Sequence, residues 1–234
     1  MKARLISTAV ILPLVLISMW VGGLLFGAII LIASLIASQE CVALLAKRNF
    51  STHPYLSPML SSLIIVLGFY LTMTPIQAIP TTISFTLLSL LSVLWMLSAK
   101  SDNTSILNTS LSTLAPSIYP SGLLMQALLI MELEHGFYWL MILISGTAMT
   151  DTGAYLIGKR FGQHSFFNKI SPSKTIEGAV GGLVLGALTL ILVFNLFSHL
   201  HISFIQMIIL AVTFPIVAQG GDLLESALKR QANS

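Results

Sequence analysis

Eight apolar segments, each of a length suited to crossing a bilayer, constrain this chain more than any other feature. A membrane-spanning helix needs about 20 consecutive apolar residues, and lipid requires every backbone polar group to be satisfied within the helix. The segments are Leu5–Val21, Gly23–Ala46, Leu56–Met73, Ile76–Ser98, Ile106–Met131, Phe137–Ile157, Gly178–Phe197 and Ile202–Gly220. The sequence therefore predicts an all-α, polytopic membrane protein with about eight transmembrane helices. Only Gly22 lies between the first two segments, and Gly23 begins the second, which predicts a tight helical hairpin.

The charge content excludes the main soluble classes. Lys, Arg, Asp and Glu make up 8% of the 234 residues, against about 25% in an ordinary soluble domain. Too few charges remain to cover a soluble surface, and a formal net charge of +3 gives no basic face for nucleic acid. The single cysteine, Cys41, excludes an intramolecular disulfide and a cysteine-based metal cluster.

The basic residues predict an orientation. With a cytoplasmic N-terminus, eight spans place every Lys and Arg on the cytoplasmic side, as the positive-inside rule requires. These residues are Lys2, Arg4, Lys47, Arg48, Lys100, Lys159, Arg160, Lys169, Lys174, Lys229 and Arg230. The outside turns hold Pro75, the Glu132–His135 stretch and the Ser198–His201 turn, with no Lys or Arg. Both termini are therefore predicted to be cytoplasmic.

The chain is expected to have two parts. Residues 1–135 carry five spans, and residues 136–234 carry three more with the longest cytoplasmic loop, from about Gly158 to Glu177. The fifth span, rich in Ser, Thr and Pro, is expected to be kinked or partly interfacial. The N-terminal Lys2 and Arg4 precede an apolar run without a convincing cleavage site, which favours an uncleaved first helix.

Five carboxylates fall near the cytoplasmic side and are candidates for function, because ionisable groups in a membrane are costly. They are Glu40, Asp151, Glu177, Asp222 and Glu225. Glu40 could simply pair with Lys47 or Arg48, and Glu177 could favour the positive end of a helix. Asp151 lies about two turns before Lys159, too deep for an ordinary surface residue.

The loop after Asp151 has the parts of a phosphate site. It combines cations, hydroxyls and the N–H groups of a helix start. Its candidate ligands are Lys159, Arg160, Lys174, Ser171, Ser173 and Thr175. Attraction to lipid headgroups and topology setting explain the same basic residues without a site.

Two further patterns follow the loop. Gly178, Gly182 and Gly186, with Gly181 beside them, favour close helix packing. If the tail is helical, Asp222, Ser226, Lys229 and Arg230 share a face that suits a metal–phosphate ligand. A solvated end of a span would look similar.

Taken together, these motifs resemble one family. Four motifs follow one another in the order found in bacterial phosphatidate cytidylyltransferases, the CDP-diacylglycerol synthases. They are Asp151-Thr-Gly-Ala-Tyr155, Gly158-Lys-Arg-Phe-Gly162, Ile170-Ser-Pro-Ser-Lys-Thr-Ile-Glu-Gly178 and Gly221-Asp-Leu-Leu-Glu-Ser-Ala-Leu-Lys-Arg230. The resemblance covers about Asp151–Arg230. Residues 1–150 are similar only as a hydrophobic multi-span region.

The resemblance implies an activity. Phosphatidate would attack the α-phosphorus of CTP and give CDP-diacylglycerol and pyrophosphate, with Mg²⁺ as cofactor, at the cytoplasmic side of a bacterial inner membrane. Asp222, Lys174 and Asp151 would be catalytic, with Asp222 and Asp151 as metal ligands. Substrates would be held by Ser171, Ser173, Lys174, Thr175, Ser226, Lys229, Arg230, Lys159 and Arg160. The expected partners are CTP, phosphatidate, membrane lipids and a second copy in a homodimer, and no nucleic acid.

The family pattern and this sequence diverge after Arg230. The family continues, after a four-residue spacer, with Lys-Asp, a His-Gly-Gly … Asp-Arg-x-Asp segment and a last span, whereas here Gln231–Ser234 fill the spacer. We expect a partial active site with little or no transfer activity in residues 1–234. Two alternatives stay open: a non-catalytic membrane subunit, and a small-solute or ion transporter using Asp151 and Glu40. Transporters usually have related halves, and none is visible here.

Overall fold

The computed structural model describes residues 2–72, 78–100, 106–167, 171–197, 200 and 202–232. These residues form two compact units, unit 1 (Met1–Phe137) and unit 2 (Tyr138–Ser234). Each unit is described by itself.

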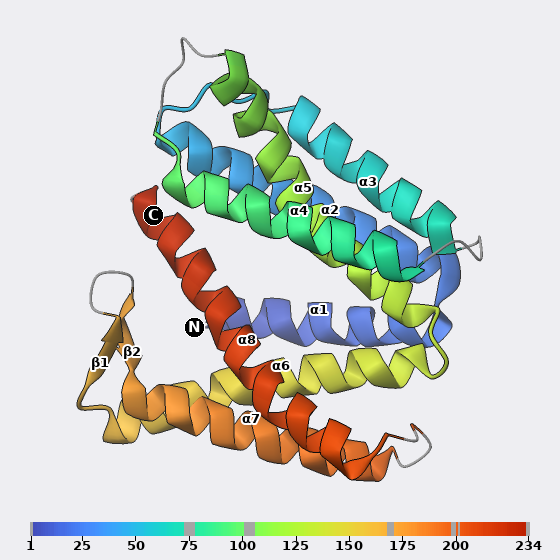
Figure 1. Ribbon diagram of the computed structural model, residues 1–234, viewed down its shortest axis with the longest axis vertical. Helices are drawn as coiled ribbons and strands as arrows, with labels where there is room; N and C mark the ends of the chain where they lie inside the picture. The colour runs from blue at the N-terminus through green and yellow to red at the C-terminus, as the bar shows by residue number, and fades with distance from the viewer. Residues whose placement is uncertain are drawn as a thin grey trace. The chain divides into compact units, whose positions relative to one another are not determined.

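The protein is all-α apart from one small strand pair (Figure 1). The helices are α1 (Lys2–Val21), α2 (Gly23–Lys47), α3 (Leu56–Thr72), α4 (Ala78–Ser98), α5 (Ile106–Met131), α6 (Gly136–Phe161), α7 (Ile176–Leu196) and α8 (Phe204–Gln231); the strands are β1 (Ser165–Phe167) and β2 (Ser171–Thr175). Within the described residues, six of these helices are long and apolar enough to cross a membrane, and α3 and Ile11–Val21 of α1 are shorter apolar helices. The expected polytopic, helical class is confirmed.

Each predicted segment coincides with one helix, and the boundaries differ mainly in unit 2. Met73 and Ile76, two of the expected ends, lie outside the described residues. The helical backbone is interrupted between α1 and α2 at Gly22, where φ is 68°. The φ of Gly23 is 53°. These left-handed values are open to glycine at little cost.

The fifth predicted span is the centre of unit 1. Helix α5 is continuous through Pro116 and Pro120 and packs against α2, α3 and α4. Four of its small polar residues, Ser112, Thr113, Ser117 and Ser121, are buried. Hydroxyls bridge the helices: Ser57 donates to the Thr113 carbonyl at 2.9 Å and Ser89 to that of Ile118 at 3.2 Å. The residues that predicted a kinked or interfacial segment therefore serve close helix packing.

One arginine donates hydrogen bonds to carbonyl groups at the end of α4. The Arg48 guanidinium, just after α2, donates to the carbonyls of Met96 and Ala99 and lies over the Phe50 ring. Partial burial lowers the pKa of this guanidinium from its usual value. These contacts give Arg48 a structural role at the end of α4.

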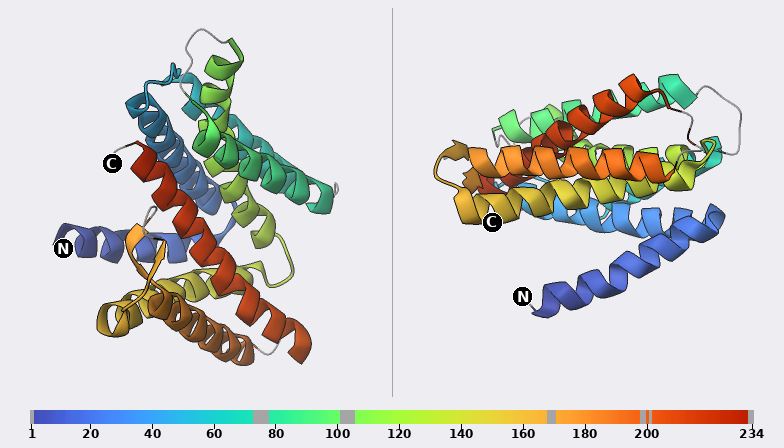
Figure 2. Two further views of the ribbon diagram at one scale, coloured as in Figure 1. Left: turned by 60° about the vertical axis from the view of Figure 1, so that its left-hand side comes forward. Right: turned by 90° about the horizontal axis from the view of Figure 1, so that it is seen from below.

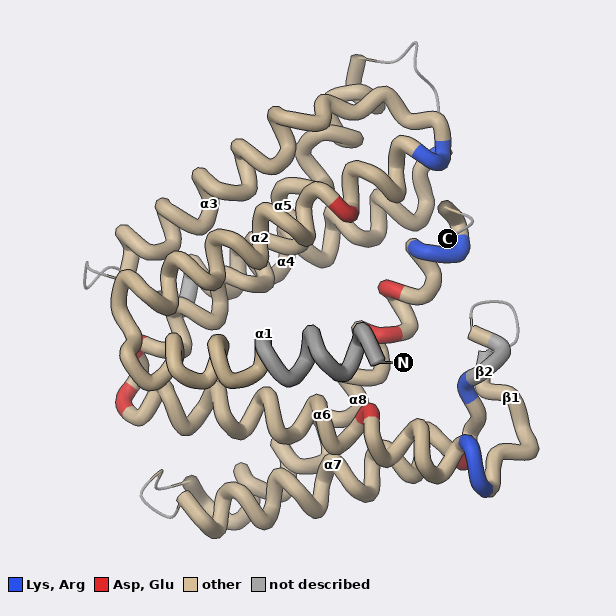
Figure 3. Tube along the Cα trace, turned by 180° about the vertical axis from the view of Figure 1, so that it is seen from behind, with Lys and Arg blue, Asp and Glu red and all other residues tan. Residues whose placement is uncertain are grey.

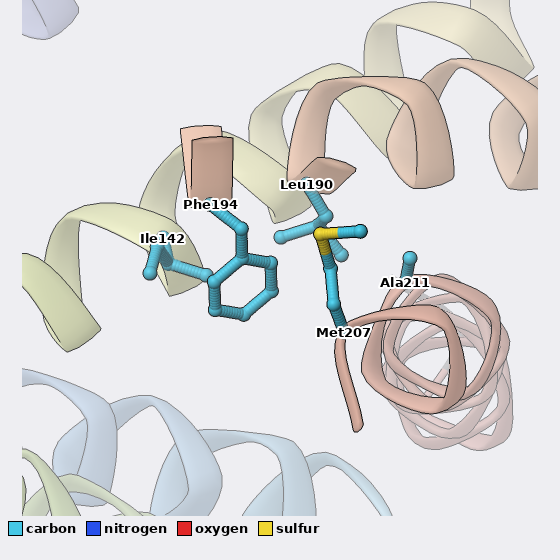
Figure 4. Close-up of a cluster of buried hydrophobic side chains, with 5 residues drawn as sticks. All are labelled: Ile142, Leu190, Phe194, Met207 and Ala211. Atoms are coloured by element: carbon cyan, nitrogen blue, oxygen red, sulfur yellow. The ribbon is translucent and has the colours of Figure 1, made fainter. Parts of the chain in front are cut away.

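Unit 2 packs α6, α7 and α8 around a small apolar core. Figure 4 shows its buried members: Ile142 from α6, Leu190 and Phe194 from α7, Met207 and Ala211 from α8. The Trp139 ring packs edge-on against Phe194, with centroids 5.9 Å apart. This core fixes the three helices at the end opposite the strands.

The glycines of α7 allow the helices of unit 2 to approach closely, as the sequence predicts. Gly178, Gly181, Gly182 and Gly186 are all buried. A Cβ at Gly182 would lie 2.7 Å from the Thr150 carbonyl oxygen, and one at Gly186 would lie 2.9 Å from Pro215 Cγ. The close packing of α6, α7 and α8 therefore depends on these glycines.

We expect Gly182→Ala to lower the free energy of unfolding by about 1–3 kcal/mol, the usual cost of overpacking. Gly220→Ala in α8 is the matched control, because its added Cβ would meet nothing within 4 Å. Thermal denaturation in detergent measures both variants. Equal loss of stability in the two would contradict the packing role of Gly182.

The strand pair was not predicted. Strands β1 and β2 are antiparallel, with Ser165 opposite Thr175 and Phe167 opposite Ser171. Figure 2 shows them projecting from the end of unit 2 where α6 stops and α7 starts. Strands of three and five residues are too short for a periodic signal.

Candidate active site

A cavity of about 420 Å³ lies in unit 2 and brings together four elements. It is within the size range of small-ligand sites, about 300–1,000 Å³. Its walls come from the last turns of α6, from β1 and β2, from the first turn of α7 and from the middle of α8. The lining residues are Asp151, Ala154, Tyr155, Gly158, Lys159, Phe166, Lys174, Thr175, Gly178, Ala179, Gln219, Asp222 and Leu223.

Charged side chains from three elements meet in this cavity. Asp151 comes from α6, Lys174 from β2 and Asp222 from α8. The Lys174 ammonium forms an ion pair with the Asp222 carboxylate, with 27% and 51% of the two side chains exposed. Asp151 lines the same cavity as this ion pair. Two carboxylates and a cation therefore share one partly open site.

The other charged residues of unit 2 that the structure describes lie near the same end. In Figure 3, charged positions occur around the strands, at the adjacent end of α6 and along the C-terminal part of α8, while the rest of α7 and α8 is tan. Lys159 and Arg160 occupy the last turn of α6, where cations favour the negative end of the helix dipole.

Two N–H groups at the start of α7, where the sequence predicts a phosphate site, donate hydrogen bonds within the protein. Thr175 is the N-cap, and its hydroxyl accepts from the Gly178 N–H at 3.1 Å. The Ile176 N–H donates to the His164 carbonyl at 2.8 Å. These two N–H groups therefore already have partners within the protein.

The structure brings some predicted residues together and separates others. Asp151, Lys159, Lys174, Thr175 and Asp222 line the cavity. Arg160, Ser171, Ser226, Lys229 and Arg230 are not among its described lining residues; the Ser173 side chain lies outside the described part of the chain.

Two of these outlying residues have clear surroundings. The Lys229 ammonium contacts the Glu225 carboxylate at 2.5 Å, one turn back along α8. The Arg160 guanidinium lies 5.7 Å from the centre of the Phe161 ring. The tail is helical as assumed, but the cavity reaches only its first turn beyond Gly220.

The sequence analysis did not single out Tyr155 and Gln219 as site residues. Tyr155 follows Asp151 by four positions on α6, and Gln219 precedes Asp222 by three on α8. Residues at these spacings share a helix face, so the rule that grouped the tail residues would also have found these two. The Gln219 amide donates to the Ala179 carbonyl at 3.2 Å and ties α8 to the start of α7.

The donor set fits a magnesium ion held jointly with a phosphate ligand. Mg²⁺ prefers oxygen ligands and is often bound by one or two carboxylates together with substrate phosphates. Asp151 and Asp222 supply two carboxylates on one cavity. No group of three or more His, Cys, Asp or Glu side chains suited to a metal occurs in the described ranges, so further ligands would come from substrate or water.

Comparison with known proteins identifies the family of this chain. A model of the cytidylyltransferase family matches residues 2–233. The phosphatidate cytidylyltransferase of Bacillus subtilis is 44% identical over 81 residues, 35% of this chain and 30% of the relative. That of Aquifex aeolicus is 36% identical over 113 residues, 48% of this chain and 40% of the relative.

The matched segments thus span less than half the length of these relatives. The family model covers almost the whole of this sequence, including the α6–β2–α8 cavity. This chain belongs to the cytidylyltransferase family.

Proposed function

We propose that the cavity of unit 2 is the site of cytidylyl transfer from CTP to phosphatidate, giving CDP-diacylglycerol and pyrophosphate. The observation that carries the proposal is the meeting of Asp151, Lys174 and Asp222 in one cavity. Two carboxylates suit a metal bound with phosphates, and ammonium groups suit the phosphates themselves. The relatives named above are phosphatidate cytidylyltransferases, which gives the substrates of this proposal.

The residues divide by chemistry. Asp151 and Asp222 would hold Mg²⁺, which would neutralise charge on the transferring phosphoryl group. Lys174 and Lys159, which both line the cavity, would bind phosphate oxygens. The hydroxyl of Thr175 is already engaged with the Gly178 N–H, so its phosphate role would be shared with capping. The other predicted substrate ligands would bind substrate only in a site that extends beyond this cavity. They are Ser171, Ser173, Arg160, Ser226, Lys229 and Arg230.

The test is transfer by the purified protein in mixed micelles containing phosphatidate, followed with radiolabelled CTP. The cavity leads us to expect a lipid-soluble labelled product and one equivalent of pyrophosphate, both dependent on Mg²⁺. The divergence from the family pattern after Arg230 instead predicts little or no transfer, and this assay decides between the two expectations. Label in the lipid phase without phosphatidate, or pyrophosphate without labelled lipid, would exclude this reaction.

The multi-pass character supports a proposal on location. We propose eight spans, both termini cytoplasmic, and a site at the cytoplasmic face of a bacterial inner membrane, with a homodimer as the assembled form. The support is that all eleven Lys and Arg residues then lie inside. The described ionisable residues of unit 2 gather toward one end of it (Figure 3), which also favours an interfacial enzyme over a transporter with charges at the membrane midplane.

Cysteine labelling tests the orientation. In a Cys41→Ser background, we expect a membrane-impermeant thiol reagent added to intact spheroplasts to label Glu134→Cys and to leave Ser173→Cys unlabelled until the membrane is permeabilised. Labelling of Ser173→Cys from outside would overturn both the orientation and the cytoplasmic site.

A further inference from the structure

We propose that Glu177 is a positioning residue that ties the end of α6 to the start of α7 and so holds Lys159 and Lys174 in place along the wall of the cavity. The inference rests on the proposed function for its consequence in catalysis. Its structural part stands on hydrogen bonds within unit 2 that the family resemblance does not assign to any role.

The Glu177 carboxylate binds a segment well before it in the chain. One oxygen accepts the backbone N–H of Gln163 at 3.1 Å, and the backbone N–H of His164 donates to both oxygens at 3.3 Å. The His164 ring Nδ1 lies 2.6 Å from Oε1. Charge-assisted bonds of this kind are stronger than neutral ones, so one side chain fixes two consecutive backbone groups and a ring.

Capping does not account for this arrangement. The N-cap of α7 is Thr175, which already satisfies the Gly178 N–H. The carboxylate is instead directed across to residues 163 and 164. The sequence interpretation of Glu177 as a helix-dipole residue describes its place in the first turn and leaves these long-range contacts unexplained.

Backbone hydrogen bonds stabilise the same region between the end of α6 and the start of α7. Ile176 N–H donates to the His164 carbonyl at 2.8 Å, and Gly162 N–H donates to that of Gly158 at 3.0 Å. A Cβ at Gly162 would lie 2.7 Å from Thr175 Cγ2. Residues 162–164 and 175–177 therefore form one interlocked joint.

The two segments of the joint follow the two cavity lysines in the sequence. Lys159 is in the last turn of α6, just before Gly162, and Lys174 directly precedes Thr175. Both line the cavity. Preorganised charges lose effect steeply when displaced, and a shift of 1 Å can cost about a hundredfold in rate. Loosening the joint should therefore impair catalysis while the glycine-packed helices stay in place.

Spin-label distances test the joint without any activity. Labels at Arg160→Cys and Ser173→Cys, beside the two lysines, in a Cys41→Ser background should give a narrow distance distribution that Glu177→Ala broadens. Glu225→Ala is the matched control, because it removes a carboxylate paired only one turn away on α8, and it should leave the distribution narrow. An unchanged distribution in Glu177→Ala would overturn the inference.

Kinetics test the consequence. We expect Glu177→Ala to lower kcat by about ten- to a hundredfold with the KM for CTP changed less than about threefold, and Glu177→Gln to lower kcat less, since an amide oxygen still accepts an N–H. His164→Ala should have the smallest effect because both backbone bonds remain. Broadened distances with wild-type kcat would overturn the positioning role. Absence of transfer in the unsubstituted protein would instead count against the proposed function, and the distance measurement would still decide the joint.

Discussion

Asp222→Asn is expected to reduce CTP-dependent formation of CDP-diacylglycerol by about a hundred- to a thousandfold, the usual cost of losing one preorganised electrostatic group. Asp222 supplies one of the two carboxylates on the cavity and carries the ion pair with Lys174. Asparagine keeps the shape and removes the charge that a magnesium ion needs. The rate is measured with labelled CTP at saturating Mg²⁺.

A second measurement separates metal binding from general damage. Mn²⁺ binding, followed by electron paramagnetic resonance, should weaken in Asp222→Asn together with the rate. Glu225→Gln removes an exposed carboxylate three residues further along the same helix, outside the described cavity lining, and should leave Mn²⁺ affinity within about twofold of the parent protein, as surface changes usually do. Retention of half the transfer rate in Asp222→Asn would refute its assignment as a metal ligand.

The helices were predictable because lipid imposes a length on each of them. The segment Ile106–Met131 was predicted with the observed ends. Its burial in unit 1 was not, because Ser112, Ser117 and Ser121 read as a polar, interfacial pattern; close contacts between helices are what such small residues allow. Apolar counting likewise ended the last span at Gly220, whereas the backbone hydrogen bonds continue to Gln231.

The site was predictable in its charged residues and not in its shape. Asp151 stood out because ionisable groups are rare in this chain, and the family resemblance added catalytic roles for Lys174 and Asp222. The structure brings the three together in one cavity. Helical spacing placed Lys229 and Arg230 on the face of Asp222, but it does not tell how far along a helix a cavity extends. The joint at Glu177 depends on contacts thirteen and fourteen positions apart, which no local pattern encodes.

Lys174→Ala is expected to lower transfer by about a hundredfold and, at the same time, to tighten Mn²⁺ binding in the absence of nucleotide by about three- to tenfold. The Lys174 ammonium pairs with Asp222 and so competes with a metal for that carboxylate. Because both side chains are partly exposed, the pair is weak enough to open. When Mg²⁺ and CTP bind, Lys174 would exchange the carboxylate for a phosphate oxygen.

The opposite directions of the two effects make this prediction specific to Lys174. Lys174→Arg should recover part of the transfer, since a planar fork does not replace a compact ammonium, and should keep Mn²⁺ binding near the parent value because a cation still faces Asp222. Lys229→Ala provides the comparison: that lysine pairs with Glu225, so its loss should change Mn²⁺ affinity far less. Weaker Mn²⁺ binding in Lys174→Ala would mean that the lysine supports the metal site instead of competing for it, and unchanged transfer would return Lys174 to the role of a topology-setting cation.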